Sequence, residues 1–128
     1  MRVISIAVLV AGAVLACAPP STVGGTMHSP NVITREEIEK SNVFNAYDAI
    51  SMLRPQFLNS HGATTISGSD TGYPRVYLNH QLFGDLQSLR TMDVHGISEI
   101  RYYDGTEASN RFGLGNVSGA IEVITDAQ

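Results

Sequence analysis

Two patterns of apolar and polar residues run along this chain, and each predicts a different kind of element. Apolar residues with a period of about 3.6 indicate an amphipathic helix, whereas strict alternation indicates a strand. The helical pattern lies over residues 43–53, where Phe44, Tyr47 and Ile50 share one side. Pro55 ends this helix, because the residue before a proline disfavours the helical conformation.

Two shorter helices are also predicted. Thr34 and Glu37 have the spacing of a capping box, in which each side chain accepts a hydrogen bond from the other residue's backbone amide, so a helix should cover residues 35–40. Lys40 near its end suits the negative end of the helix dipole. The other helix covers about residues 85–92, where leucines lie on adjacent turns.

Alternation predicts about four strands. The clearest lies over residues 97–103, with odd-numbered side chains on one face and even-numbered side chains on the other. Residues 120–125 alternate in the same way, and residues 75–79 form a third candidate. A weak fourth at residues 64–66 is followed by a glycine-rich loop. These elements predict a single α+β domain, in which two or three short helices cover a small mixed sheet of about four strands.

The N-terminal residues have the composition of a targeting segment. Arg2 precedes an uncharged apolar run that reaches the cysteine, and this run is shorter than the roughly 20 residues that a membrane-spanning helix needs. Residues 1–16 are therefore predicted to be a signal peptide. Residues 17–31 are rich in Pro, Gly, Ser and Thr and are predicted to be a flexible tether. The folded domain is expected over residues 32–125, with residues 126–128 as a tail.

The only cysteine stands directly after this apolar run, in the segment Val14-Leu15-Ala16-Cys17. This segment resembles a bacterial lipobox, whose cysteine receives lipid chains and becomes the new N-terminus. Its position predicts lipidation of Cys17 and makes the membrane a partner; an ordinary secretory signal cut near Ala16 is the alternative. Ala18 stands where well-known inner-membrane lipoproteins carry Asp, which favours the outer membrane. There the protein is expected to face the periplasm.

Composition and charge argue against several kinds of function. The net charge of −4 and the sequence pI of about 5.4 disfavour nucleic-acid binding, which requires a basic surface. The four histidines lack the spacing that places two metal ligands on one side of an element, so no metal or other cofactor is expected. Ser60, His61 and Asp70 lack the sharp turn that exposes a catalytic serine. We therefore expect no enzyme.

Spaced glycines form a third pattern near the end of the domain. Gly113, Gly115 and Gly119 lie between two alternating segments, where glycine allows the chain to leave one strand and enter the next. Together with the segments before it, this pattern resembles the plug domain of TonB-dependent outer-membrane receptors. At Asn79-His80 the family usually has Asp-Gly. The matching segments follow one another in the family's order and are residues 33–38, 45–55, 75–79, 97–105 and 112–121.

This resemblance implies a function. The chain is expected to be a non-catalytic, lipid-anchored envelope protein whose plug-like domain acts as a protein-interaction module, linked to outer-membrane transport. It would be a plug without the barrel that follows the plug in receptors. An outer-membrane protein is the expected partner. Capture of a small ligand, such as a siderophore or another nutrient, is the alternative, and an enzyme is the least favoured class.

The resemblance also implies candidate contact residues, because in these receptors the ligand touches loops at one end of the plug sheet. The matching loops lie at residues 59–63, 68–73 and 81–85. They carry aromatic and hydrogen-bonding side chains that suit a partner or ligand surface, namely His61, Asp70, Tyr73, Gln81 and Phe83. The alternative is that these loops are ordinary polar turns.

Replacing Cys17 with Ser tests the predicted lipid anchor. Serine cannot receive the lipid, so the Cys17→Ser protein should move from the membrane fraction to the soluble envelope fraction when cells are fractionated. Thr22→Ser, which changes the tether and keeps the cysteine, should stay with the membrane. Retention of the Cys17→Ser protein in the membrane, or a mature N-terminus at another residue, would contradict the lipobox.

Overall fold

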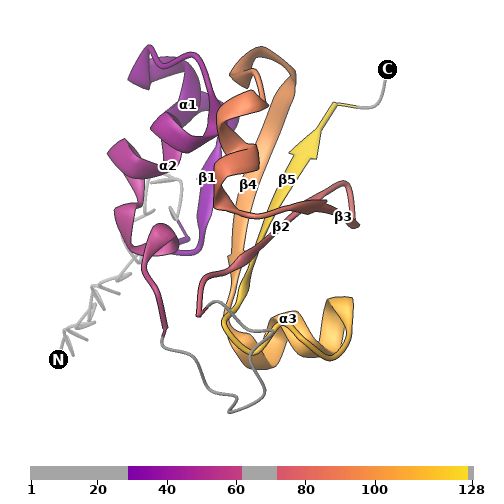
Figure 1. Cartoon of the computed structure of the whole chain (residues 1–128). Coiled ribbons are helices and arrows are strands. Elements are labelled where there is room, and N and C mark those ends of the chain that lie inside the picture. Colours follow the sequence, from indigo (N-terminus) through magenta and orange to yellow (C-terminus); the bar gives the residue numbers. More distant parts are fainter. Residues whose placement is uncertain (1–28, 62–71, 127–128) are drawn as a thin grey trace, which may run out of the picture.

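A five-stranded mixed sheet forms the centre of the molecule, with helices packed against it (Figure 1). The computed structural model describes residues 29–61 and 72–126. β2 and β5 run parallel, and every other neighbouring pair runs antiparallel. The structure confirms the α+β class and the mixed sheet, with five described strands where about four were predicted. In spatial order the strands are β1 (Val32–Thr34), β4 (Ile97–Tyr103), β5 (Ala120–Thr125), β2 (Arg75–Leu78) and β3 (Gln81–Gly84).

The two longer helices of the main layer begin at side-chain caps. α1 (Arg35–Ser41) starts at a complete capping box: the Thr34 hydroxyl accepts from the Glu37 amide at 3.4 Å, and the Glu37 carboxylate accepts from the Thr34 amide at 3.0 Å. α2 (Ala46–Leu53) starts after Asn45, whose side chain caps its first turn. Three short 3₁₀ helices complete this part of the chain, η1 (Pro55–Leu58), η2 (Leu86–Thr91) and η3 (Val94–Gly96).

The main core lies between the sheet and the layer formed by α1, α2 and η2 (Figure 1). Ile50 of α2, Leu89 of η2 and Ile100 of β4 are completely buried there. Ile121 and Val123 of the central strand β5 point to the same side, as their alternation predicted. Burial of each such side chain contributes roughly 1.5–3 kcal/mol to stability, so this cluster is the main source of apolar burial.

α3 (Gly105–Phe112) packs on the opposite face of the sheet, at the end where β4 stops and β5 begins (Figure 1). Asp104 caps its first turn. Ala108 is buried against the sheet, and Phe112 stacks on Tyr77 of β2 with ring centroids 3.9 Å apart. The two faces of the sheet are therefore covered unequally, by a broad layer on one side and by a single short helix on the other.

The strand at residues 97–103 does not alternate regularly, contrary to the prediction. Ile97 and Ile100 both lie in the main core, because the register between β4 and β5 shifts between Ile97 and Glu99. The odd-numbered and even-numbered side chains therefore exchange faces within one strand. The weak strand expected at residues 64–66 lies outside the described residues.

Gln81 and Phe83 lie in a strand, whereas the sequence had placed them in a loop. Asn79 and His80 both have positive φ, of 46° and 71°, and form a two-residue turn that pairs Gln81 with Leu78. The chain therefore reverses at once and adds β3 to the edge of the sheet. Because β3 lies at the edge of the sheet, it offers backbone hydrogen-bonding groups as well as side chains to a binding partner.

Alanine in place of Gly119 should be strongly destabilising. Gly119 has a φ of 94°, and an added Cβ would lie 2.8 Å from the carbonyl oxygen of Tyr103, so both the backbone and the space oppose a side chain. Gly113 has a φ of 93° with nothing within 4 Å of an added Cβ, and Gly96 has neither obstacle. We expect losses of roughly 1–3 kcal/mol for Gly113→Ala, because its φ of 93° and ψ of 177° lie in a region that is essentially restricted to glycine. The loss should be larger for Gly119→Ala and less than about 0.5 kcal/mol for Gly96→Ala.

Urea unfolding of the three variants measures these losses. Equal losses for Gly113→Ala and Gly119→Ala would show that the neighbouring strand yields easily, and that the entry to β5 is not tightly packed.

Candidate functional site

Among the described residues, Glu122 is the only charged residue that is completely buried, with 0% of its surface exposed. It lies in the middle of β5 and points away from the main core, since Ile121 and Val123 on either side point into that core. Its strand neighbours are Tyr77 of β2 and Arg101 of β4. A buried charge of this kind is costly unless other groups compensate for it.

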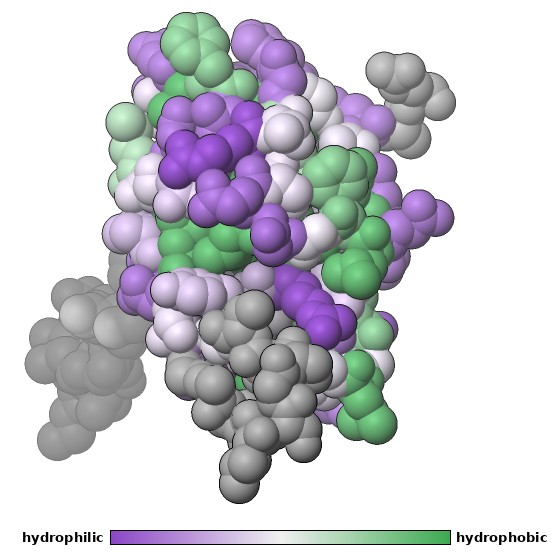
Figure 2. Space-filling view, in the orientation of Figure 1, coloured by the Kyte–Doolittle hydropathy of each residue, from purple (hydrophilic) through white to green (hydrophobic). Residues whose placement is uncertain are grey.

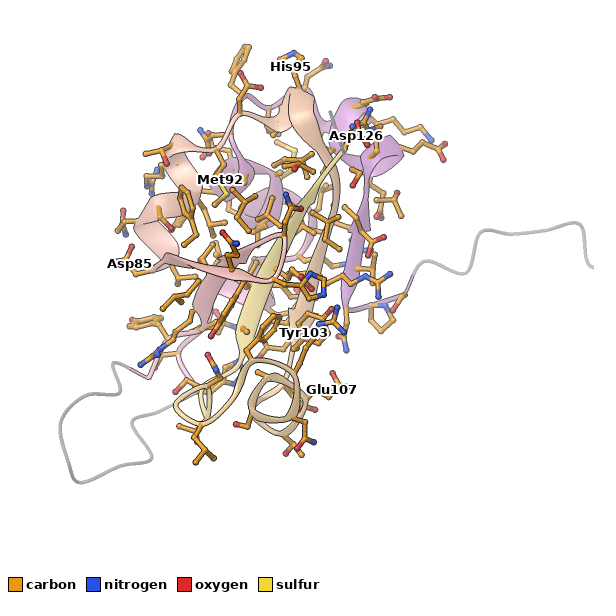
Figure 3. The ribbon with its side chains drawn as sticks, turned by 90° about the vertical axis from the view of Figure 1, so that its right-hand side faces the viewer. Asp85, Met92, His95, Tyr103, Glu107 and Asp126 are labelled. Atoms are coloured by element: carbon orange, nitrogen blue, oxygen red, sulfur yellow. The ribbon has the colours of Figure 1, made fainter. Side chains whose placement is uncertain are left out.

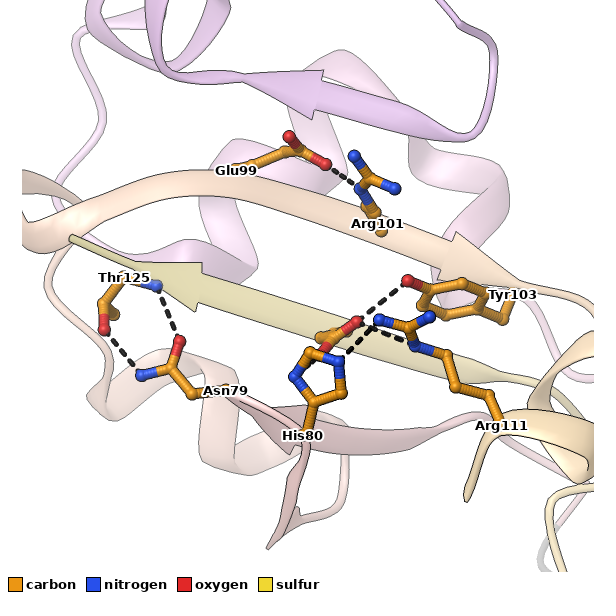
Figure 4. Close-up of polar contacts among 8 residues, drawn as sticks. Asn79, His80, Glu99, Arg101, Tyr103, Arg111 and Thr125 are labelled. Carbon is orange, nitrogen blue, oxygen red and sulfur yellow. Dashed lines mark hydrogen bonds and ion pairs between the residues drawn. The ribbon is translucent and has the colours of Figure 1, made fainter. Parts of the chain in front are cut away.

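Three side chains from different elements surround the Glu122 carboxylate (Figure 4). The Tyr103 hydroxyl donates to Oε2 at 2.9 Å, and the Arg111 Nε of α3 lies 3.5 Å from the same oxygen. His80 Nδ1 lies 2.9 Å from Oε1. We call these four residues the carboxylate network. It joins the central strand, its neighbour β4, the helix α3 and the β2–β3 turn.

The proton on His80 can be placed from its second nitrogen. Arg111 Nη2 lies 2.6 Å from His80 Nε2, and a guanidinium can only donate, so Nε2 accepts. A neutral imidazole then carries its proton on Nδ1, the atom that faces Glu122. The N–H of Nδ1 therefore faces the carboxylate, but the contact lacks the alignment of a hydrogen bond and leaves Glu122 Oε1 without a hydrogen-bond partner among the described residues. The attraction between this N–H dipole and the negative carboxylate links His80 to Glu122.

Burial raises the pKa of the Tyr103 hydroxyl, and the hydrogen bond and negative charge of Glu122 raise the pKa further. Arg111 and Arg101 oppose this increase more weakly. Tyr103 consequently keeps its proton and remains a donor to the carboxylate at neutral pH. The three partners of Glu122 thus compensate for its charge and fix its position.

The turn that carries His80 is tied to the end of β5. The Asn79 side chain donates to the Thr125 hydroxyl at 2.8 Å and accepts from the Thr125 amide at 3.0 Å. At the second position of such a turn glycine is preferred, and a side chain in this left-handed conformation costs roughly 1 kcal/mol or more. His80 occupies that position at a φ of 71°. From this position its imidazole, which is 61% exposed, reaches the Glu122 carboxylate.

The residues proposed from the family loops lie in several places. His61 Nε2 is 2.7 Å from the Tyr102 hydroxyl, and Tyr73 borders a cavity of about 560 Å³ beside α2 and η2. Gln81 and Phe83 are exposed on β3. Asp70 lies outside the described residues. Tyr73 and Gln81 stand at opposite ends of β2, so the structure does not bring these two into one site.

The sequence interpretation did not identify the carboxylate network. One signal was present, because Glu122 is a charged residue between Ile121 and Val123 in a strand that otherwise reads as buried. Its partners gave no signal. Tyr103 lies on β4, Arg111 lies on α3, and His80 lies in the turn between β2 and β3. The sequence therefore separates all three from Glu122 on β5.

Comparison with known proteins does not identify this arrangement. No protein-family model matches the chain, and no curated protein or solved structure matches it. Within the two described ranges, no three His, Cys, Asp or Glu side chains come together as metal ligands. The helices described here are also too short or too polar to span a membrane. The resemblance to plug domains therefore rests on the motif residues alone.

Removing the Tyr103 hydroxyl tests the carboxylate network. Tyr103→Phe should lower the free energy of unfolding by about 1–2 kcal/mol near pH 7, because Glu122 loses its donor. Tyr73→Phe is the matched control, since Tyr73 is 48% exposed, and it should change stability by less than about 0.5 kcal/mol.

The difference in stability between wild type and Tyr103→Phe should also depend on pH. The Tyr103 pKa is raised in the folded state, so the stabilisation from its protonated hydroxyl is fully present below the ordinary tyrosine pKa of about 10. It is lost as the pH rises through the raised pKa. The difference in the free energy of unfolding between wild type and Tyr103→Phe should therefore shrink at alkaline pH. A constant difference up to about pH 11, or none at pH 7, would contradict this assignment.

Proposed function

We propose that this chain is a non-catalytic interaction module of the bacterial cell envelope. It is held to the outer membrane by lipid on Cys17, faces the periplasm, and binds a protein partner that takes part in outer-membrane transport. The family resemblance of the motifs supports the envelope setting. The observation that carries the binding role is the exposed apolar surface of β3.

Leu82 and Phe83 are consecutive residues of β3, and they are 58% and 46% exposed. Figure 2 shows hydrophobic surface on the right-hand side of the molecule, where Figure 1 places β3. Large apolar side chains that gather at one place on a surface mark interaction sites, whereas single exposed ones are ordinary. Phe44 lies between α1 and α2 and Met52 lies on α2, so neither belongs to β3.

The carboxylate network supports this role by fixing the position of β3. The turn before β3 is held to β5 through His80 and Asn79, and both contacts come from side chains of the turn itself. A surface that is already ordered loses little conformational entropy when a partner binds. The carboxylate network therefore helps to fix the hairpin that presents Leu82 and Phe83.

Capture of a small ligand is the second candidate, and the cavity beside Tyr73 favours it. Tyr47, Tyr73 and Leu86 give this cavity an aromatic and aliphatic wall, and Asp85 and Gln87 add polar groups. Its described lining contains no Lys or Arg, which suits a neutral or cationic ligand better than an anionic metal chelate.

Site-specific photo-crosslinking in intact cells distinguishes these functions. A photoreactive phenylalanine analogue at Phe83 should give a discrete adduct with an outer-membrane transport protein, identified by mass spectrometry. The same analogue at Phe44, which is 78% exposed, is the matched control and should give none. An analogue at Tyr73 that alone yields an adduct, or no protein adduct from Phe83, would contradict the proposed role of β3.

A further inference from the structure

β3 is the last strand in the described sheet, and its backbone is paired on one side (Figure 3). Figure 3 looks onto this edge, with β3 in front of the central strands, Asp85 directly after it, and Tyr103 above α3. In an antiparallel pair, the N–H and C=O groups of alternate residues point toward the neighbour and away from it. β3 pairs with β2 alone among the described strands, so its outward groups face the surroundings.

β3 is only four residues long and carries a bulge, but it lacks the other features that usually prevent pairing at a sheet edge. Those features are charged side chains, especially Lys, proline, or a covering helix or loop. Gln81, Leu82, Phe83 and Gly84 include no charge and no proline. A bulge leaves Phe83 opposite no residue of β2, since Val76 pairs with Gly84 and Tyr77 with Leu82. Apolar groups therefore flank the open backbone.

We propose that β3 accepts an extended segment of the partner as an additional strand of the sheet. This inference rests on the proposed function and specifies how the partner is recognised. The outward backbone groups supply the hydrogen bonds, and Leu82 and Phe83 supply apolar contacts to side chains of the segment. Because β3 carries no charge, a charged residue directly opposite it would be buried without a partner, so the recognised segment is uncharged over this stretch.

A second copy of this chain fits the edge less well than a partner protein. Complete coverage of Leu82 and Phe83 would bury on the order of 200 Å² of side-chain surface per copy, and the strand itself spans roughly 13 Å. A stable pair of proteins buries roughly 1,200 Å² or more. A symmetric pair joined through β3 alone falls well short of that area. A partner protein is not limited by symmetry, because surfaces beside its strand can also contact this side of the sheet.

The rigid attachment of the hairpin makes strand addition favourable. The turn residues Asn79 and His80 are bound to Thr125 and Glu122, so β3 is already extended and in place before a segment arrives. Only the segment then loses conformational entropy when it binds.

Peptide titration of the complete mature protein, isotopically labelled for NMR, tests the proposal. The probe is an acetylated and amidated peptide, Ser-Val-Thr-Val-Thr-Val-Ser. Two further peptides carry N-methyl groups at the odd-numbered or at the even-numbered positions, which removes alternate donors. The unmodified peptide should shift the amide signals of β3 and slow their exchange with solvent. One N-methylated peptide should lose binding, and the other should keep it, because a strand donates toward its neighbour from alternate residues.

Charged variants give the second half of the test. The double variant Leu82→Lys, Phe83→Lys should weaken peptide binding at least about tenfold at an unchanged melting temperature. Phe44→Lys, also at an exposed apolar position, should have no effect. Equal binding of both N-methylated peptides, shifts confined to other elements, or dimerisation through β3 at higher protein concentration would each overturn strand addition.

The two proposals fail separately. A crosslink from Phe83 to an envelope protein, combined with no peptide effect at β3, would keep the interaction function and reject strand addition. The absence of any crosslink from Phe83 would reject the interaction function itself.

Discussion

Glu122 brings a negative charge onto the central strand at a position from which water is excluded, and an isolated charge there would cost several kcal/mol. The surrounding elements supply groups that compensate for this charge. Tyr103 donates to the carboxylate, while Arg111 and His80 approach it from α3 and from the β2–β3 turn. One buried charge therefore links α3 and the β2–β3 turn, which lie outside the apolar core on the other face, to the central strands.

This arrangement explains how an unequal sheet remains a defined structure. The main core fixes β4, β5 and β2 through aliphatic side chains, but it does not hold β3, whose two large apolar side chains are exposed. The outermost hairpin is held instead by polar contacts from its turn to Glu122 and Thr125. A strand that is fixed by its turn can leave its outer edge open. An outer edge that stays open is able to pair with another chain.

Local signals accounted for the parts of the fold that were predicted. The capping box of Thr34 and the alternation of β5 act over a few residues, so the sequence displays them directly. α3 was missed because Ala108 is its buried residue, and one small side chain produces no helical period. β3 was missed because Asn79-His80 is not a usual hairpin dipeptide. The carboxylate network depends on side chains brought together by the sheet, which no local pattern encodes.

Hydrogen exchange in His80→Gly tests most directly whether the buried charge holds the hairpin. Glycine suits the left-handed turn position better than histidine, so turn preference alone predicts slower amide exchange in β2 and β3 and a more stable protein. Our account predicts the opposite, because the contact between His80 and Glu122 is lost. Exchange in the hairpin should accelerate about tenfold, which corresponds to about 1.4 kcal/mol. Equal or stronger protection of β3 in His80→Gly would show that Glu122 does not hold the hairpin.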